Sequence, residues 1–341
     1  MLIMLPAVQR FVASTGARIY RLPCEAFPDL IAFAYLVLEA GVPTLVDTGS
    51  GYGDSNAQLL AGLEAVRTDF GEPIGLADIR RILITHGHID HFGGLPLFVE
   101  RTGAQVAIHE LDRRILTAYE ERVVLATAAL GRYLEQAGVP AERQAALMQM
   151  YGFSKRHVRS LSVDMTLVDG MELDGMRFIH TPGHCPGQVC IAVGDILLSA
   201  DHILPTITPH QSPESITPNM GLGHYLDSLT KVRAMGGFDM ALGGHEHPFR
   251  DVYKRIDEIR ASHLRKLDKI LNIVQQAEGP ITTDEISTRL YTRVRGFHVL
   301  LALQEVGAHV EYLYNHGQLA VANLEDVERE ANPALLYRVA K

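Results

Sequence analysis

Short apolar runs separated by turns dominate the first 110 residues, and this pattern is typical of buried strands. The four clearest runs are residues 31–38, 44–46, 81–84 and 105–108. Between these runs, apolar side chains recur at helical spacing in residues 55–69 and 95–101. Because strands and helices alternate, we expect an α/β layered fold in this part of the chain.

The pattern changes beyond this point. Residues 110–158 are rich in Ala, Leu, Glu, Arg and Met, and they predict two or more helices inserted between strands. Strands resume at 176–180 and 188–199, and Gly194-Asp195 is expected to fold the second of these into a hairpin. The remaining predicted segments are a loop with four prolines at 203–221, a helix at 222–235 and a strand at 239–242.

The last part of the chain predicts a small separate domain that begins near residue 256. Its predicted helices are 264–277, 283–290 and 297–306. Residues 310–314 and 319–321 flank Asn315-His316-Gly317, which favours a hairpin turn. Three helices followed by a two-stranded hairpin predict a winged-helix domain over residues 256–341.

Composition narrows the class of protein. Apolar residues make up 47% and charged residues 21% of the 341 residues, which is an ordinary globular balance. The net charge of −9 argues against a protein that grips nucleic acid through its phosphates. No apolar run reaches the length of about 18 residues that predicts a membrane span.

Cysteine usage and the first residues indicate the compartment. The three cysteines are Cys24, Cys185 and Cys190, and this odd number at these spacings predicts no disulfide framework. The apolar start at residues 1–6 lacks the basic region and the long apolar region of a secretion signal. We therefore expect a cytoplasmic protein.

The strongest chemical signal is the pattern His-x-His-x-Asp-His at residues 86–91, directly after the predicted strand at 81–84. Imidazoles at positions i and i+2 on a turn can converge on one metal ion, as His86 and His88 would do here. Asp90 and His91 can face a second metal ion beside the first. Nitrogen and carboxylate ligands suit Zn²⁺ and also iron or manganese.

Three further candidate ligands lie just beyond the ends of predicted strands. His184 lies in a turn after the strand at 176–180, Asp201 ends an apolar run, and His245 follows the strand at 239–242. Functional groups of α/β folds collect at the carboxyl ends of strands. We therefore expect these side chains to lie near the His-rich turn.

In this order, the segments resemble the metal motifs of the metallo-β-lactamase superfamily, and the turn Asp47-Thr48-Gly49 matches as well. The resemblance covers roughly residues 15–255. It implies a four-layer αββα sandwich over residues 1–255, with a helical insertion at about 110–158. The predicted winged helix at 256–341 narrows the resemblance to the lactamase-beta-2-like branch.

The resemblance also implies a role for each candidate residue. The implied ligands are His86, His88 and His184 for a first metal ion, Asp90, His91 and His245 for a second, and Asp201 as the bridge between them. The expected cofactors are therefore two divalent metal ions, with Zn²⁺ as the first expectation and iron or manganese as alternatives.

The implied mechanism is metal-assisted hydrolysis. Two cations about 3.5–4 Å apart would share a bridging water and lower its pKa, and the resulting hydroxide would attack a carbonyl or phosphorus. Asp90 would orient this nucleophile and pass a proton to the leaving group. Asp47 is expected to support the metal loop through hydrogen bonds or to cap its turn. His202 and Tyr225 are candidates for substrate contact, and His202 is equally a candidate for packing at a strand end.

Three functions fit such a site. The first expectation is hydrolysis of a small ester, thioester or lactone, although Leu204 stands where homoserine-lactone-degrading enzymes have a tyrosine. A ribonuclease or phosphodiesterase is disfavoured, because residues 255–341 contain 11 Lys and Arg against 12 Asp and Glu. The third is an enzyme similar to the persulfide dioxygenases, with one iron held by the first two histidines, His184 and Asp201.

These candidate functions also indicate which partners to expect. We expect a small-molecule substrate and neither a nucleic acid nor a membrane. The predicted helix at 297–306 is apolar and contains no Lys or Arg, so it suits packing on the hydrolase domain or in a homodimer better than insertion into a nucleic-acid groove.

Overall fold

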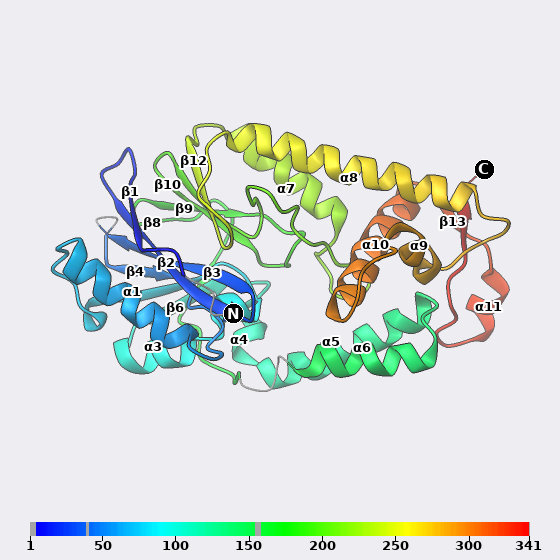
Figure 1. Cartoon of the computed structure of the whole chain (residues 1–341), viewed down its shortest axis with the longest axis horizontal. Coiled ribbons are helices and arrows are strands. Elements are labelled where there is room, and N and C mark those ends of the chain that lie inside the picture. The colour runs from blue at the N-terminus through cyan, green and yellow to red at the C-terminus, as the bar shows by residue number, and fades with distance from the viewer. Residues whose placement is uncertain (1–4, 39–40, 154–157, 341) are drawn as a thin grey trace. The chain divides into compact units, whose positions relative to one another are not determined.

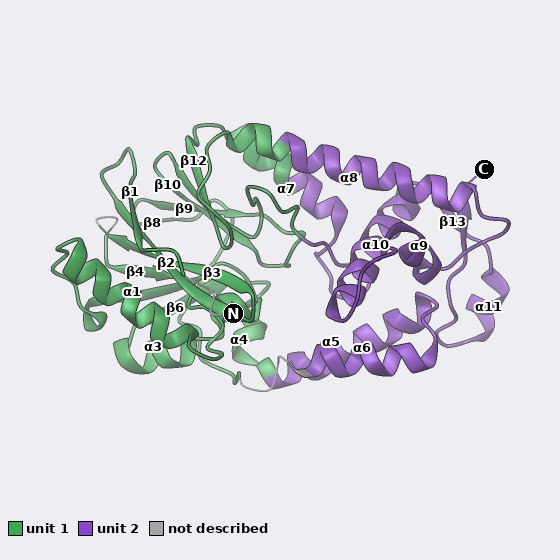
Figure 2. Ribbon diagram, in the orientation of Figure 1, with its two compact units in different colours: residues 1–119, 158–209, 228–256 green, residues 120–157, 210–227, 257–341 purple. Residues whose placement is uncertain are grey.

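The computed structural model describes residues 5–38, 41–153 and 158–340, so the apolar start at 1–4 lies outside it. The chain forms two compact units (Figure 2). The first comprises residues 1–119, 158–209 and 228–256, and the second comprises residues 120–157, 210–227 and 257–341. The domain limits expected from the sequence stay a prediction.

The first unit contains a seven-stranded sheet whose strands follow chain order (Figure 1). They are β1 (Gln9–Val12), β2 (Arg18–Phe27), β3 (Leu30–Leu38), β4 (Thr44–Val46), β5 (Arg81–Ile84), β6 (Gln105–His109) and β7 (Met165–Leu167). Strands β1 to β4 pair antiparallel, whereas β4 to β7 pair parallel. The four apolar runs predicted as strands are confirmed as β3 to β6.

The second sheet of this unit has five strands in the order β12-β11-β10-β9-β8. They are β8 (Glu172–Leu173), β9 (Met176–His180), β10 (Val189–Val193), β11 (Ile196–Ala200) and β12 (Met240–Gly243). Val193 pairs with Ile196 across Gly194 and Asp195, which confirms the predicted hairpin. Strand β12 joins β11 in parallel.

One hydrophobic core joins the two sheets. Strand β3 contributes Phe33, Tyr35 and Val37, which alternate along the strand and therefore point to one face. Alternate residues of β10 contribute in the same way. The other buried members from the paired strands are Ile19, Val46, Leu83, Ala107, Leu167, Met176, Phe178, Val189, Ile191, Val193, Ile196, Leu198 and Leu242.

Helices cover the first sheet on the side away from this core. They include α1 (Ser55–Asp69), α2 (Ile89–Phe92), α3 (Leu95–Thr102) and α4 (Arg113–Thr117), with a 3₁₀ turn at Leu76–Asp78. Helix α1 contacts β2, where Gly62 brings the helix close to Leu22. Leu22 points opposite to the core residue Ile19, because side chains three positions apart lie on opposite faces of a strand.

The second unit is mostly helical. Its elements are α5 (Tyr119–Gln136), α6 (Ala141–Phe153), α9 (Thr283–Leu290), α10 (Phe297–Asn315), β13 (Leu319–Val321), α11 (Leu324–Arg329) and β14 (Tyr337–Val339). Helices α7 (Leu222–Met235) and α8 (Val252–Gln275) contribute residues to both units. The core of the second unit packs α5 and α6 against α10, and Tyr133 of α5 donates a hydrogen bond to the Leu303 carbonyl at 3.0 Å.

One prediction for the tail is wrong, and the start of one predicted helix is corrected. Residues 310–314 form no strand, because α10 continues to Asn315. Val310 and Leu313 extend the buried helical stripe of Leu303 and Val306, and this packing outweighs the strand propensity of the segment. The predicted helix at 264–277 is the second half of the longer α8.

The antiparallel partner of β13 is β14, which the hydrophobic pattern did not predict. Ile281, between α8 and α9, also bridges Tyr337 of β14. The chain is thus a mixed α/β protein with two facing sheets, and the winged helix stays a prediction. No helix in the described part of the chain is both long and apolar enough to cross a membrane.

Phe178 tests the core that joins the sheets, since its side chain is fully buried. We expect Phe178→Ala to lower the free energy of unfolding by about 3–5 kcal/mol, because it leaves a cavity lined by both sheets. Urea denaturation of the metal-free protein measures this change. Val12→Ala is the control, because Val12 is 57% exposed, and its effect should stay within about 0.5 kcal/mol. Equal effects of the two substitutions would contradict the two-sheet core.

Candidate metal centre

The seven predicted ligands all follow strands of the first unit. His86 and His88 lie in the turn after β5, and the short helix α2 carries Asp90 and His91. The remaining three follow β9, β11 and β12, and they are His184, Asp201 and His245. The facing sheets direct these strand ends to one place, so side chains far apart in sequence meet.

The first group consists of three histidines and an aspartate. His88 Nδ1 lies 3.1 Å from His86 Nε2 and 3.0 Å from His184 Nε2. Asp201 Oδ2 lies 3.7 Å from His184 Nε2. The four ligand atoms lie within 4.8 Å of one another, so one metal ion could contact all of them.

The second group lies on the other side of Asp201. His245 Nε2 is 3.3 Å from Asp90 Oδ2 and 3.3 Å from Asp201 Oδ2. His91 Nε2 is 3.9 Å from Asp90 Oδ2 and 3.6 Å from Asp201 Oδ1. Asp201 therefore contacts both groups, which is the geometry required of a bridging carboxylate.

Hydrogen bonds on the outer side of the rings orient His86 and His91. Thr85 Oγ1 lies 3.1 Å from His86 Nδ1, and Asp47 Oδ2 lies 2.8 Å from His91 Nδ1. Asp47 also accepts hydrogen bonds from the Thr85 backbone N–H and hydroxyl, each at 2.8 Å. Because the outer nitrogen of each ring is hydrogen-bonded, the inner nitrogen faces the other side chains of the site.

His88 and His245 are oriented in the same way by different partners. The Ile31 carbonyl lies 2.7 Å from His245 Nδ1. Cys185 Sγ lies 3.3 Å from His88 Nε2, on the side of the ring that points away from the group. Burial raises the pKa of the Cys185 thiol well above its usual range, so it is protonated at neutral pH. Cys185 therefore faces the His88 ring as a neutral thiol.

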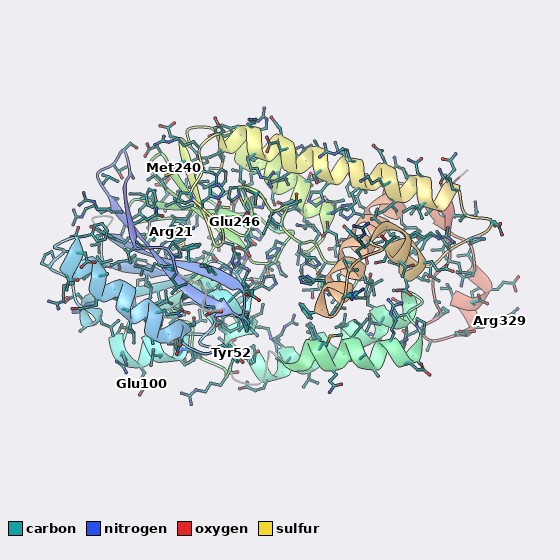
Figure 3. The ribbon with its side chains drawn as sticks, in the orientation of Figure 1. Arg21, Tyr52, Glu100, Met240, Glu246 and Arg329 are labelled. Carbon is teal, nitrogen blue, oxygen red and sulfur yellow. The ribbon has the colours of Figure 1, made fainter. Side chains whose placement is uncertain are left out.

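The turn after β12 holds His245 through contacts with the first sheet. Arg21 donates to the carbonyl of Glu246, and both residues are labelled in Figure 3. The Arg21 guanidinium lies 3.2 Å above the centre of the Phe33 ring. Gly244 accepts a 2.9 Å hydrogen bond from the Phe33 N–H. A Cβ on Gly244 would lie 2.4 Å from Asp201 Oδ1, so only glycine permits this close approach of backbone to ligand.

Two buried atoms indicate that the site fits a cation. In the described part of the chain, His91 Nε2 and Asp201 Oδ1 are buried and have no hydrogen-bond partner. Buried polar atoms without partners are costly and usually indicate an absent ion or water. A donor set of imidazole nitrogens and carboxylate oxygens suits Zn²⁺, iron or manganese.

Two histidines of the first group, His86 and His88, are uncharged. Burial, followed by the neighbouring His91, lowers the pKa of His86 well below its ordinary value. Burial and the nearby His184 lower the pKa of His88 to about 3. Both rings are therefore neutral at pH 7, which is the form that binds metal.

The second group carries protons when no metal is bound. Burial opposes the charged form of His91, but the carboxylates of Asp201, Asp47 and Asp90 outweigh it and raise the pKa to about 10. For His245, Asp201 outweighs burial in the same way, and its pKa is raised well above the ordinary value. In return, His245 and His91 hold the pKa of Asp201 well below its usual range despite burial.

The other two predicted site residues lie in different places. His202 is fully buried in the turn after β11, and burial lowers its pKa to about 3. Tyr225 is fully buried in the second unit, where its ring lies 5.4 Å from that of His263. Substrate contact by either residue stays a prediction.

A third group of ligand-type residues, in the second unit, was not predicted. His263 Nδ1 lies 3.0 Å from His309 Nε2, close to the carboxylate of Glu305. Lys266 forms an ion pair with Glu305, and the Gln211 N–H donates to the same carboxylate at 2.7 Å. Because Glu305 is already neutralised, we interpret this group as a buried polar network rather than an ion site.

The sequence of the chain is similar to those of proteins named as metallo-hydrolases. A family model described as metallo-beta-lactamase superfamily matches residues 28–273. The chain is 22% identical to the probable metallo-hydrolase YqjP of Bacillus subtilis (strain 168), over 84% of this chain and 88% of that protein. It is 27% identical to the probable metallo-hydrolase YflN of the same organism, over 40% of this chain and 47% of that protein.

Two crystal structures match almost the whole chain. The metallo-beta-lactamase family protein TTHA1429 from Thermus thermophilus is 27% identical, with a TM-score of 0.75 over 94% of this chain and 98% of that one. A beta-lactamase domain protein from Burkholderia ambifaria is 22% identical, with a TM-score of 0.74 over 97% of this chain and 94% of that one. The second of these likenesses supports the fold alone.

The raised pKa values of His91 and His245 predict that metal binding releases protons. A proton on either ring competes with the metal, so the apparent affinity should rise with pH, by about tenfold per pH unit for each displaced proton. For His91 this dependence should extend to about pH 10. Titration calorimetry in two buffers of different ionisation heat counts the protons, and His91→Ala should release fewer. Binding heats that do not change with buffer would contradict this charge assignment.

Proposed function

Because the chain belongs to the metallo-beta-lactamase superfamily, we propose that it is a two-metal hydrolase that cleaves a small ester, thioester or lactone. Membership of the family supports a hydrolase, and the two curated relatives are both named probable metallo-hydrolases. The observation that carries the proposal of two metals is the shared contact of Asp201 with both groups of ligands.

We assign the ligands as the sequence suggested. Those of the first metal are His86, His88 and His184, those of the second are Asp90, His91 and His245, and Asp201 contacts both. Zn²⁺ is the proposed metal, because it accepts this mixture of nitrogen and oxygen donors, and iron and manganese are the alternatives.

The chain's own residues prepare the site for hydrolysis. When bound, two divalent cations supply an acidified water and polarise the bond that it attacks. Asp90 is exposed enough to reach that water, since 15% of its side chain is accessible while His91 is fully buried. Its pKa lies below the ordinary range, because the histidines His91 and His245 outweigh burial, so it is available as a carboxylate. We propose that Asp90 holds the water and carries the proton to the leaving group.

Asp47 supports the proposed ligands from behind and does not face the place where the reaction would occur. Its carboxylate joins His91 to the backbone of Thr85, the residue before the first ligand. The same side chain therefore orients a ligand of the second metal and fixes the turn that begins the first group. We propose that Asp47 positions both groups without contacting a metal.

The proposed substrate is small and uncharged or weakly charged. A net charge of −9 disfavours a long anionic partner such as RNA. The tail adds no basic surface, because residues 255–341 contain 11 Lys and Arg against 12 Asp and Glu. A ribonuclease is therefore the weaker candidate.

For the tail we propose a winged-helix domain with a structural role. Helices α8, α9 and α10 are followed by the paired strands β13 and β14, with the short helix α11 between them, an order similar to that of such a domain. Helix α10 contains no Lys or Arg, and its central residues, including Leu303 and Val306, are buried. A helix with this surface suits packing within the protein or in a homodimer better than contact with a nucleic-acid groove.

A single-iron oxygenase is the second candidate, because the first group alone is a complete ligand set. His86, His88, His184 and Asp201 could hold one metal without the second group. The protonated histidines of the second group would then remain paired with the carboxylates of Asp90 and Asp201. The two candidates differ in whether a metal displaces these protons.

We also propose a cytoplasmic location. Cys24, Cys185 and Cys190 are all free and buried, as expected of a chain that folds under reducing conditions. A cytoplasmic enzyme would act on metabolites found inside the cell.

The role of Asp90 provides the test of the hydrolase. We expect Asp90→Ala to lower kcat/KM by about 10²–10⁴-fold, because the variant loses both a ligand and the proton carrier. The measurement is hydrolysis of a panel of small esters, thioesters and lactones by the zinc-loaded protein. Asp69→Ala is the control, since Asp69 is exposed at the end of α1. Equal rates for wild type and Asp90→Ala across the panel would refute the proposal.

A further inference from the structure

Asp112 connects two turns of the metal centre, although it is not a ligand. It lies between β6 and α4 and is fully buried. Its Oδ2 accepts a hydrogen bond from the Gly87 N–H at 2.9 Å, and its Oδ1 accepts one from the Gly187 N–H at 2.9 Å. One carboxylate therefore holds two backbone segments that are 100 residues apart in sequence.

Each of these glycines lies beside ligands of the first group. Gly87 separates His86 from His88, and Gly187 is in the same turn as His184. The distance between the two turns determines whether the three ring nitrogens can meet at one point. Asp112 constrains that distance, because it is bonded to both turns and its two oxygens have a fixed separation.

The approach of Asp112 to the turn that carries His184 is close enough to require Gly187. A Cβ on Gly187 would lie 2.7 Å from Asp112 Cγ, and a Cβ on Gly87 would lie 2.2 Å from Ile115 Cδ1. A side chain at Gly187 would push its turn away from Asp112, whereas one at Gly87 would chiefly meet the flexible end of Ile115. Gly187 therefore permits the contact with Asp112, and this contact holds the turn that carries His184 in place.

Two other hydrogen bonds tie the same turns together. The Val189 N–H donates to the Thr85 carbonyl at 2.9 Å, which joins the two segments directly. His180 Nε2 lies 2.8 Å from the Pro186 carbonyl, and this contact closes the turn that carries His184. These bonds lie at the edges of the turns, whereas Asp112 contacts Gly87 between two ligands.

Asparagine could not replace this aspartate. A carboxylate offers two acceptor oxygens, one for each N–H. An amide offers only one acceptor, and its NH₂ group would face the other N–H donor. Asp112→Asn therefore keeps the size of the side chain but breaks one of the two connections.

We propose that Asp112 is a positioning residue that sets the geometry of the first metal site. This inference rests on the proposed two-metal function. The second site does not depend on Asp112 in the same way, because Asp90 and His91 lie on α2 and His245 follows β12. A defect at Asp112 should therefore affect the two sites unequally, whereas a general loss of stability would weaken both.

The test compares the two metal affinities of Asp112→Asn with those of the wild type. Co²⁺ and Zn²⁺ are titrated against a competing chelator, and His88→Ala and His245→Ala show which affinity belongs to which site. We expect Asp112→Asn to weaken the first site by about 10- to 100-fold and the second by less than about threefold. The Co²⁺ absorption of the first site should change as well. Asp195→Asn is the control, because Asp195 accepts a 2.7 Å bond from the Ser14 N–H away from the metal centre.

Hydrogen exchange of the wild type provides a measurement that needs no variant. In the metal-free protein, the Gly87 and Gly187 amides should exchange slowly, since both are bonded to a buried carboxylate. Fast exchange of either amide would overturn the inference, as would equal weakening of both sites or unchanged affinities in Asp112→Asn. Failure of the wild type to bind two metals would instead overturn the proposed function.

Discussion

The structure depends on holding seven ligand-type side chains close together in one buried space. The ligand atoms of each group lie within 4.8 Å of one another, and Asp201 lies between the groups. Without a cation, protons on His91 and His245 balance the carboxylates of this site. Metal ions can replace those protons and also satisfy atoms that lack hydrogen bonds, such as Asp201 Oδ1.

The rest of the first unit serves to hold these donors together. Two sheets share one core, so the turns after β5, β9, β11 and β12 lie close to one another. Hydrogen bonds behind the ligands then fix each ring, from Asp47 to His91 and from the Ile31 carbonyl to His245. Glycines allow the backbone to approach, and Gly244 is the clearest example because a side chain there would collide with Asp201. Stability and chemistry are therefore linked through the same turns.

Much of this could be predicted from the sequence, because the signals were local. Apolar runs between turns located the strands, and residues 86–91 brought four ligand-type side chains together within one turn. The tail was harder, because Val310 and Leu313 fit a strand as well as a helix and only packing of α10 decides between them. Asp112 could not be predicted at all. Its partners are backbone N–H groups of two glycines, which leave no pattern in the side chains.

Anomalous X-ray diffraction from crystals of the protein purified without added metal tests the central claim most directly. Data collected at the absorption edges of zinc, iron and manganese identify each metal and locate it. The account predicts two peaks, one among His86, His88 and His184 and one among Asp90, His91 and His245, with Asp201 in contact with both. A single iron peak in the first group, with no metal peak in the second group, would contradict it.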